Sequence, residues 1–389
     1  MTRFPFVINR ENVFMKMRYP FLLLSFFYLI ACQDKVETID IPVVNFGNDC
    51  KESLLDRIKC QFIPLSTDSI LLGRIDVVKF VDKRIFVLDS KRTNTLCVFG
   101  DDGRFITKVS SFGDGPTEYS YLSNFFIDEE KRILTLADYN RAYLCYYDLD
   151  TYKYLSCDKF DFYTDCVPLS DDRWAWYTPR GFMTPKRNGY YLKITNRDNE
   201  TISLLNPTYF VSPHVINSNS HFHQYQGNTF IHFPFSATVW KVERDTSLLA
   251  YEVSFGNRQM PPLDYMMKIG KDKKNYTGEL FESGYVYTYK LSELEDYLQV
   301  TFMCGKSTYF GFYNKDDEIT FTYEFPEFIR ATGLAGLRGL TGTHNDCFVG
   351  YIDPGILKRN YTPHANLQEL SDKAKEDDNP ILCLFKFEE

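Results

Sequence analysis

A period of 48 residues runs through the middle of the chain and constrains its fold more than any other feature. The apolar segment Leu96–Phe99, followed by Gly-Asp-Asp-Gly, is matched 48 residues later by Leu144–Tyr147, followed by Asp-Leu-Asp-Thr. Two further steps of 48 reach Leu192–Thr195 and Trp240–Glu243, each again followed by a polar, turn-forming segment. Repeats of about 40 to 50 residues with several short strands each are typical of β-propeller blades. A β-sandwich, the alternative all-β architecture, does not require one register to recur four times.

The remaining strand-like segments are enough for six blades of four antiparallel strands. After the four repeats, a fifth blade is expected over about 285–325, with a sixth beyond it. Insertions are predicted near 256–295 and 354–379, because proline-containing and helix-like segments interrupt the strand pattern there. The sixth blade lacks one strand, whereas Ile58–Leu65 is a strand without a blade. We therefore predict a propeller over 57–389 whose ring is closed by this N-terminal strand, which removes two exposed sheet edges.

Two short motifs make the similarity to a known family specific. Phe112–Tyr119 reads FGDGPTEY and resembles the G-x-G-P-G-E-Y stretch between early blades in the six-bladed β-propeller lipoproteins of Bacteroidetes, which are related in shape to NHL-repeat and TolB-like propellers. Asn379-Pro380, before the last apolar strand, fits the same family. Thr117 stands where the family commonly has glycine, so this turn is expected to have fewer backbone conformations open to it. The resemblance implies a propeller of the bacterial cell envelope and supplies no catalytic residue.

The N-terminus has the features of a lipoprotein signal peptide. Two basic residues precede the apolar segment Phe21–Ala31, whose length of about 11 residues is too short for a membrane-spanning helix, which needs about 20. The segment ends in Leu-Ile-Ala-Cys32, which resembles the lipobox of bacterial lipoproteins, where the cysteine is acylated and becomes the first residue. We therefore predict cleavage of residues 1–31, of which those before Met15 form an over-extended start, and attachment of Cys32 to the outer membrane. The alternative is a buried N-terminal core segment.

The formal net charge of −8 limits the partners of the protein. Removal of residues 1–31 takes away four basic residues and one acidic residue and changes this charge to −11. An acidic chain without a dense patch of lysine and arginine is not expected to bind nucleic acid. The protein is therefore expected to contact the membrane through its lipid. A linker over residues 32–56 is expected to connect the lipid-bearing cysteine to the propeller.

One face of the predicted propeller carries the candidate ligand-binding residues. Strand alternation places the loop after the second strand of each blade on the same face as the loops between blades. The former loops carry Arg92 in the first blade and Arg141 in the second, and the loop between these blades carries Glu118 and Tyr119. The planar guanidinium suits carboxylates, and tyrosine rings suit the faces of sugars. We predict that these four residues surround the mouth of the channel, the alternative being an interblade turn in which the arginines pair with nearby aspartates.

Three histidines are candidates for a metal site. His221 and His223 lie two residues apart on one predicted strand and so share one side of it, and His232 follows nine residues later. A zinc site needs three or four ligands held by supporting hydrogen bonds. Polar residues on an inner strand are the alternative interpretation, and neither a metal nor another cofactor is expected. The nucleophile-elbow, zinc-protease and β-lactamase motifs do not occur, so no catalytic residue is predicted.

These observations favour a non-enzymatic cell-envelope propeller that binds a glycan, a peptide or a partner protein over one face or at the channel mouth. The signal peptide, the 17% of aromatic residues and the missing catalytic motifs support this hypothesis. The rival hypothesis is a propeller enzyme, a lyase or a hydrolase, with a metal-assisted site in the central channel. A third is a structural partner of an outer-membrane complex. Fold alone cannot choose among them, because propellers host many functions.

Overall fold

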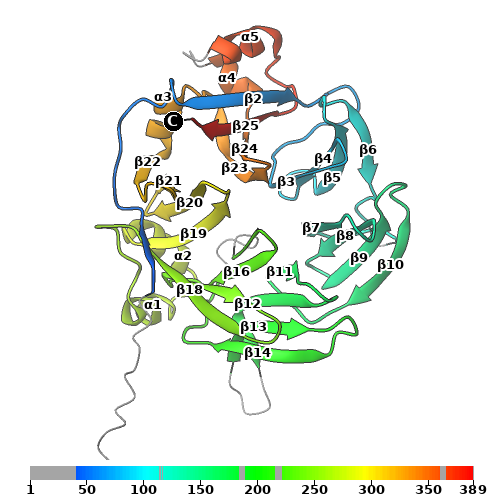
Figure 1. Ribbon diagram of the computed structural model, residues 1–389. Helices are drawn as coiled ribbons and strands as arrows, with labels where there is room; N and C mark the ends of the chain where they lie inside the picture. The colour runs from blue at the N-terminus through cyan, green and yellow to red at the C-terminus, as the bar shows by residue number, and fades with distance from the viewer. Residues whose placement is uncertain are drawn as a thin grey trace, which may run out of the picture. The chain divides into compact units, whose positions relative to one another are not determined.

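The computed structural model describes residues 41–113, 115, 117–183, 189–214, 221–359 and 365–388, so Cys32 and the predicted signal peptide lie outside the described residues. Six sheets, each with four antiparallel strands, surround a central axis (Figure 1). One sheet gains a fifth, parallel strand. The predicted all-β, six-bladed propeller is therefore confirmed.

The first four blades are meanders in which successive strands are hydrogen-bonded neighbours. Blades one and two contain β3 (Val77–Val81), β4 (Arg84–Asp89), β5 (Thr95–Gly100) and β6 (Phe105–Val109), then β7 (Leu122–Asp128), β8 (Ile133–Asp138), β9 (Tyr143–Asp148) and β10 (Tyr154–Lys159). Blades three and four contain β11 (Asp165–Pro168), β12 (Trp174–Met183), β13 (Gly189–Thr195) and β14 (Thr201–Pro207), then β15 (Phe222–Tyr225), β16 (Asn228–His232), β17 (Thr238–Val242) and β18 (Ser247–Ser254).

The 48-residue period has a structural origin in the third strand of each of these blades. Its four matched positions fall on β5, β9, β13 and β17. Leu96, Leu144 and Leu192 are fully buried there, and Trp240 is half-buried. These strands take part in the packing of blade against blade, because Leu96 and Val98 of β5 belong to the same core cluster as Tyr147 of β9 in the next blade. A β-propeller blade buries both faces only against its neighbours.

The ring closes where the two ends of the propeller share the sixth blade. Blade five contains β19 (Val286–Glu293), β20 (Tyr297–Cys304), β21 (Ser307–Asn314) and β22 (Thr320–Glu324); blade six contains β23 (Leu337–His344), β24 (Cys347–Ile352), β25 (Ile381–Phe387) and β2 (Ile58–Pro64). β2 pairs antiparallel with β25, from Ile58 opposite Phe387 to Pro64 opposite Ile381. Closure by the N-terminal strand is thus confirmed, and it gives blade six its fourth strand.

Asn379, in the Asn-Pro motif, supports this closure. Its side chain is 2% exposed and binds three backbone groups of the segment that leads from β2 to β3. Its Oδ1 accepts from the amide of Leu72 at 2.7 Å, while its Nδ2 donates to the carbonyl oxygens of Ser66 at 2.7 Å and Ile70 at 2.8 Å. An amide side chain has the donors and acceptor that this loop needs, so Asn379 joins the last strand to the first blade.

The residues before β2 are part of the ring rather than the linker expected over 32–56. From residue 41 onward this segment contains β1 (Val43–Asn45), which pairs in parallel with β18 as the outermost strand of blade four. Phe46 follows it and is fully buried in the core cluster between blades four and five. Gly47 lies against Gly256 so closely that a Cβ atom on either residue would meet the other's Cα within 2.7 Å. The segment therefore contributes to stability.

Helices occupy the two predicted insertions and one blade junction. The first insertion contains α1 (Leu263–Ile269) and α2 (Tyr276–Glu282), but it is shorter than the expected 256–295, because the inner strand β19 already begins at Val286. The second contains α4 (Pro354–Arg359) and α5 (Ala365–Lys373), between the second and third strands of blade six. A further helix, α3 (Phe325–Thr332), joins blades five and six. None of the helices in the described part of the chain is long and apolar enough to cross a membrane.

Candidate functional site

Two buried aspartates organise the loops on the face that carries the predicted residues. Asp89 and Asp138 end the second strands of blades one and two, and each is at most 1% exposed. Asp138 accepts from the backbone amides of Ser120 at 2.7 Å and Tyr121 at 3.1 Å, which belong to the loop between the two blades. Asp89 binds the amides of residues 73 and 74 in the same way. Each carboxylate therefore holds the segment that enters its blade.

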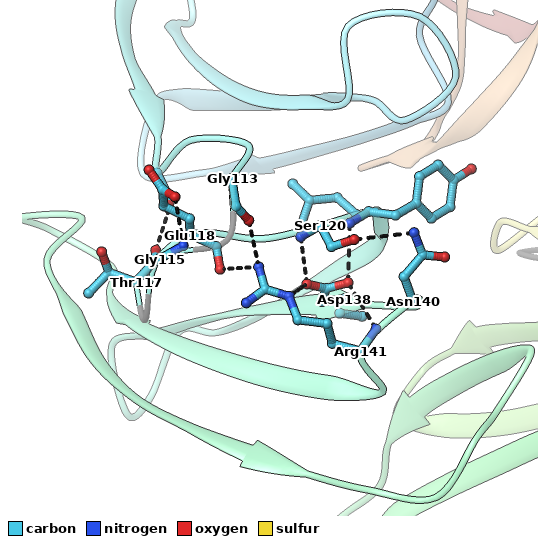
Figure 2. Close-up of polar contacts among 12 residues, drawn as sticks. Gly113, Gly115, Thr117, Glu118, Ser120, Asp138, Asn140 and Arg141 are labelled. Carbon is cyan, nitrogen blue, oxygen red and sulfur yellow. Dashed lines mark hydrogen bonds and ion pairs between the residues drawn. The ribbon is translucent and has the colours of Figure 1, made fainter.

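Arg141 extends this arrangement into a clamp on the interblade loop (Figure 2). Its Nε lies 2.9 Å from Oδ2 of Asp138, and its terminal nitrogen donates to the carbonyl oxygens of Gly113 at 3.0 Å and Glu118 at 2.7 Å. These three contacts direct the guanidinium into the loop, where it bridges two backbone carbonyls and a buried carboxylate. In this structure, the predicted ligand-binding Arg141 therefore has a local structural role.

Glu118 and Tyr119 are also engaged in the loop itself. Oε2 of Glu118 accepts from the amide of Gly115 at 2.8 Å, which closes the turn (Figure 2). Tyr119 is 1% exposed, and its hydroxyl donates to the carbonyl of Asn94 at 2.8 Å. Burial raises the pKa of Tyr119 well above its ordinary value, so the phenol is neutral. The carbonyl of Thr117, where the family commonly has glycine, accepts from Tyr147 at 3.0 Å.

Arg92 differs from Arg141 although both follow their aspartates by three residues. The backbone amide of Arg92 donates to Oδ1 of Asp89 at 2.8 Å, as that of Arg141 does to Asp138 at 3.4 Å. The Arg92 side chain is exposed, and its guanidinium has no hydrogen bond or ion pair with any described residue. Of the four predicted residues, Arg92 is thus the one whose charged group stays available to solvent.

Two of the three histidines are neighbours: the rings of His221 and His232 have centroids 5.4 Å apart, and Nδ1 of His221 lies 3.2 Å from the carbonyl oxygen of His232. The His221 ring packs against Tyr177 at a tilt of 40°, with centroids 4.2 Å apart, whereas Nε2 of His223 lies 3.4 Å from a carboxylate oxygen of Glu293. Nε2 of His232 binds the carbonyl of Tyr289 at 3.0 Å, and burial is the main cause that lowers the pKa of His232 well below its ordinary value. Within the described ranges, no three histidine, cysteine or acidic side chains are grouped so that they could hold a metal ion.

A cavity of about 780 Å³ opens at the channel mouth on this same face. We call it the channel-mouth cavity. Blades one, two, five and six supply its walls through first strands, interblade loops and the loops after second strands, and also through β20 and β21 of blade five and β24 of blade six. Its charged and aromatic lining consists of Arg74, Asp76, Lys91, Lys290, Arg338, Tyr121, Tyr139 and Tyr351. Sequence reasoning predicted the face but missed all of these residues, which lie in four separate blades.

The cavity wall holds more positive than negative charge. Asp76 is paired, because its Oδ1 lies 2.9 Å from Nε of Arg74 and its Oδ2 accepts from the amide and the hydroxyl of Ser90, both at 2.8 Å. Lys290 projects from the inner strand β19 and has no ion pair or hydrogen bond with a described residue. Burial lowers the pKa of Lys290, while the nearby carboxyl groups of Asp165 and Asp76 oppose this shift.

A series of aromatic rings begins at the cavity wall, which Tyr121 and Tyr139 line, and ends at Phe162, outside the lining. The rings of Tyr121, Tyr139 and Phe162 follow one another edge to face, with centroids 6.2 Å and 5.2 Å apart. We call this series the aromatic ridge. Phe162 is 47% exposed, and the two tyrosines are half-buried. Lys91 lies at one end, where its Nζ donates to the hydroxyl of Tyr121 at 3.0 Å.

Comparison with known proteins identifies the family. Residues 33–351 match the model of a family described as 6-bladed beta-propeller, DUF5128. The chain belongs to this family. The description of the DUF5128 propellers names a fold and no activity.

Solved structures of two Bacteroides proteins are similar to this DUF5128 propeller. A Bacteroides fragilis protein inferred to be exported is similar with a TM-score of 0.83 and 25% sequence identity, over 89% of this chain and 100% of that one. A member of the DUF4221 family from Bacteroides vulgatus has a TM-score of 0.54 and 10% identity, over 85% and 99% of the two chains, which shows the fold alone. No functionally curated protein matches this chain.

Proposed function

We propose that this propeller is a non-enzymatic, lipid-anchored protein of the cell envelope that binds a glycan in the channel-mouth cavity. The exported relative from Bacteroides fragilis supports an envelope location. The sequence ending in Cys32 supports a lipid anchor on the outer membrane, because its segment is too short to span a bilayer and resembles a lipobox.

The observation that carries the ligand class is the aromatic ridge at the rim of the cavity. Aromatic rings present flat apolar faces against which the C–H faces of sugar rings pack, and tyrosine adds a polar hydroxyl. Tyr121 and Tyr139 line the cavity beside the exposed Asn140, and four threonines also line it. The volume of about 780 Å³ lies within the range of about 300–1,000 Å³ that is usual for small-molecule sites. Flat rings beside hydroxyl and amide groups favour a glycan over an apolar ligand.

Binding should be tested with the chain from Gln33, which includes the whole compact unit 41–389. Isothermal titration against a panel of defined oligosaccharides should find at least one that binds. Tyr139→Ala should then weaken this binding about tenfold or more, whereas Tyr139→Phe should retain most of it because the ring remains. Phe112→Ala is a matched control, since that ring is 66% exposed but does not line the cavity. Equal affinity of Tyr139→Ala and wild type for the same oligosaccharide would contradict the proposed site.

The anchor needs a separate test. Mass spectrometry of the N-terminal peptide of the protein extracted from membranes should find Cys32 as the first residue, carrying acyl chains. Cys32→Ser should leave the signal peptide uncleaved and unacylated. An unmodified Cys32 within a longer N-terminal peptide would show that the protein is held in the envelope in another way.

A further inference from the structure

We propose that the channel-mouth cavity contains an anion subsite formed by Lys290, Arg338 and Lys91, so that its ligand is an acidic oligosaccharide carrying carboxylate or sulfate groups. This inference rests on the proposed glycan-binding function and adds the chemical class of the glycan. Four cationic residues line the cavity against one carboxylate, in a protein whose net charge is −8. Asp76, the one carboxylate of this lining, is paired with Arg74 and makes no ion pair with Lys290, on which it acts only through space, so the cations of the lining outnumber it.

Lys290 is the central element of the subsite. It lies on the inner strand of blade five between the buried side chains Tyr289 and Leu291, and it is itself half-buried. A partly desolvated ammonium without a counter-ion is unfavourable, and a bound anion would relieve this cost. Asp165, one of the two carboxyl groups that act on Lys290, lies on the inner strand of blade three and is 4% exposed.

Asp165 does not replace an external anion. Its two oxygens accept from the backbone amides of Cys166 at 3.0 Å and His221 at 3.1 Å. Burial raises the pKa of Asp165 to about 7, so that the group is only partly ionised at neutral pH. The positive charge of Lys290 therefore remains available to a ligand in the cavity.

Arg338 is directed to the cavity by an irregularity in β23. The pairing of β23 with β24 shifts between Leu337 and Gly339, which leaves Arg338 at a β-bulge. Bulges re-aim side chains and are frequent next to functional sites. The Arg338 side chain is exposed, lines the cavity and has no hydrogen bond or ion pair among the described residues. Its planar guanidinium can donate two parallel hydrogen bonds to a carboxylate or a sulfate.

Lys91 connects the subsite to the aromatic ridge. Its ammonium is held by the hydroxyl of Tyr121 at 3.0 Å and lies 5.7 Å from the centroid of that ring. A sugar ring packed on Tyr121 would therefore place a charged substituent beside a fixed cation. The cavity combines stacking and charge recognition, as an acidic oligosaccharide requires.

The test is isothermal titration of the chain from Gln33 with three probes of equal length: an oligogalacturonate, a sulfated oligosaccharide and a neutral oligosaccharide. We expect an acidic probe to bind at least tenfold more tightly than the neutral one at low salt, and to weaken as salt is raised. Whichever acidic probe binds more tightly distinguishes carboxylate from sulfate recognition. Lys290→Met and Arg338→Ala should each weaken binding of that probe about tenfold. Each should change the affinity for the neutral probe by less than twofold.

Lys108→Met is the matched control for Lys290→Met, because Lys108 is an exposed cation of blade one that does not line the cavity. Thermal unfolding of each variant checks that it folds. If the neutral probe binds as tightly as the acidic ones, or if Lys290→Met binds the acidic probe like wild type, the anion subsite is overturned while the glycan function stands. If no oligosaccharide binds but inorganic sulfate raises the unfolding midpoint of wild type and not of Lys290→Met, the subsite stands and the glycan function fails. If none of these probes has an effect, both proposals are overturned.

Discussion

Replacement of Arg141 by alanine tests whether this arginine is a structural clamp. The substitution removes an ion pair with a carboxylate that is 1% exposed and hydrogen bonds to the carbonyl oxygens of Gly113 and Glu118. Loss of one partner of a buried pair costs about 3–5 kcal/mol. The Arg141 side chain is 25% exposed, and Asp138 keeps the amides of Ser120 and Tyr121, so we expect the lower end, about 3 kcal/mol.

The expected change in melting temperature follows from the size of the folded unit. Unfolding of the compact unit 41–389 has an entropy of about 0.7 kcal/mol per kelvin, at roughly 2.1 cal/mol per kelvin per residue. A loss of 3 kcal/mol should therefore lower the midpoint by about 4 °C. Calorimetry measures this shift, and hydrogen exchange should become faster at the amides of the loop that Arg141 holds.

Arg92→Ala is the control for this prediction, since Arg92 occupies the equivalent position in the preceding blade. Its guanidinium makes no contact of this kind with a described residue, so the substitution should change stability by less than about 0.5 kcal/mol. Equal losses in the two variants, or an Arg141→Ala midpoint within about 1 °C of wild type, would refute the clamp.

Three further predictions concern the ring and its buried charges. Phe46→Ala, which empties a fully buried site between blades four and five, should cost about 3–5 kcal/mol in a urea titration, whereas Val43→Ala, 58% exposed in the adjoining strand, should cost little. Gly103→Ala should destabilise the protein more than Gly227→Ala in the same titration. Both glycines have φ above +70°, but a Cβ atom on Gly103 would lie 2.0 Å from a carbonyl oxygen of β2, whereas a Cβ atom on Gly227 would meet open space. Equal costs in the two variants would contradict this prediction. Burial raises the pKa of Asp165 from 3.8 to about 7, so the folded state binds the proton of this group more tightly than the unfolded state does. The free energy of unfolding should therefore fall, by up to about 4 kcal/mol, as pH rises from about 4 to 7. Asp165→Asn should lack this fall, and an unchanged pH profile in the variant would show that the group does not titrate as described.

The blades were predictable because they are local, repeated units. Each repeat alternates short apolar strands with polar turns, and this pattern depends on nearby residues alone. The third strands β5 and β9 keep their register because both must fill the same space between neighbouring blades. Closure by Ile58–Pro64 was also predictable, since one strand was left over and one blade lacked a strand.

For the candidate site, the sequence predicted only the face of the propeller on which the site lies, and not the residues that line the cavity. Asp89 and Arg92 have the same spacing as Asp138 and Arg141, yet only the second arginine is engaged in its loop. The difference arises from the loop that each arginine meets, which the spacing does not encode. A signal for Lys290 did exist, since it is a charged residue within the otherwise uncharged part of an inner strand, although its cavity could not be inferred from it.

The amino-acid sequence by itself determined the number of blades, the register of their third strands and the strand that closes the ring. These features follow from local alternation and from the requirement that every sheet edge and face be covered. Only the tertiary structure decided that the Arg141 side chain binds the interblade loop and that Lys91, Lys290 and Arg338 share one cavity. These three residues lie up to 247 positions apart in the chain, and the circular arrangement of the blades brings them to the same mouth.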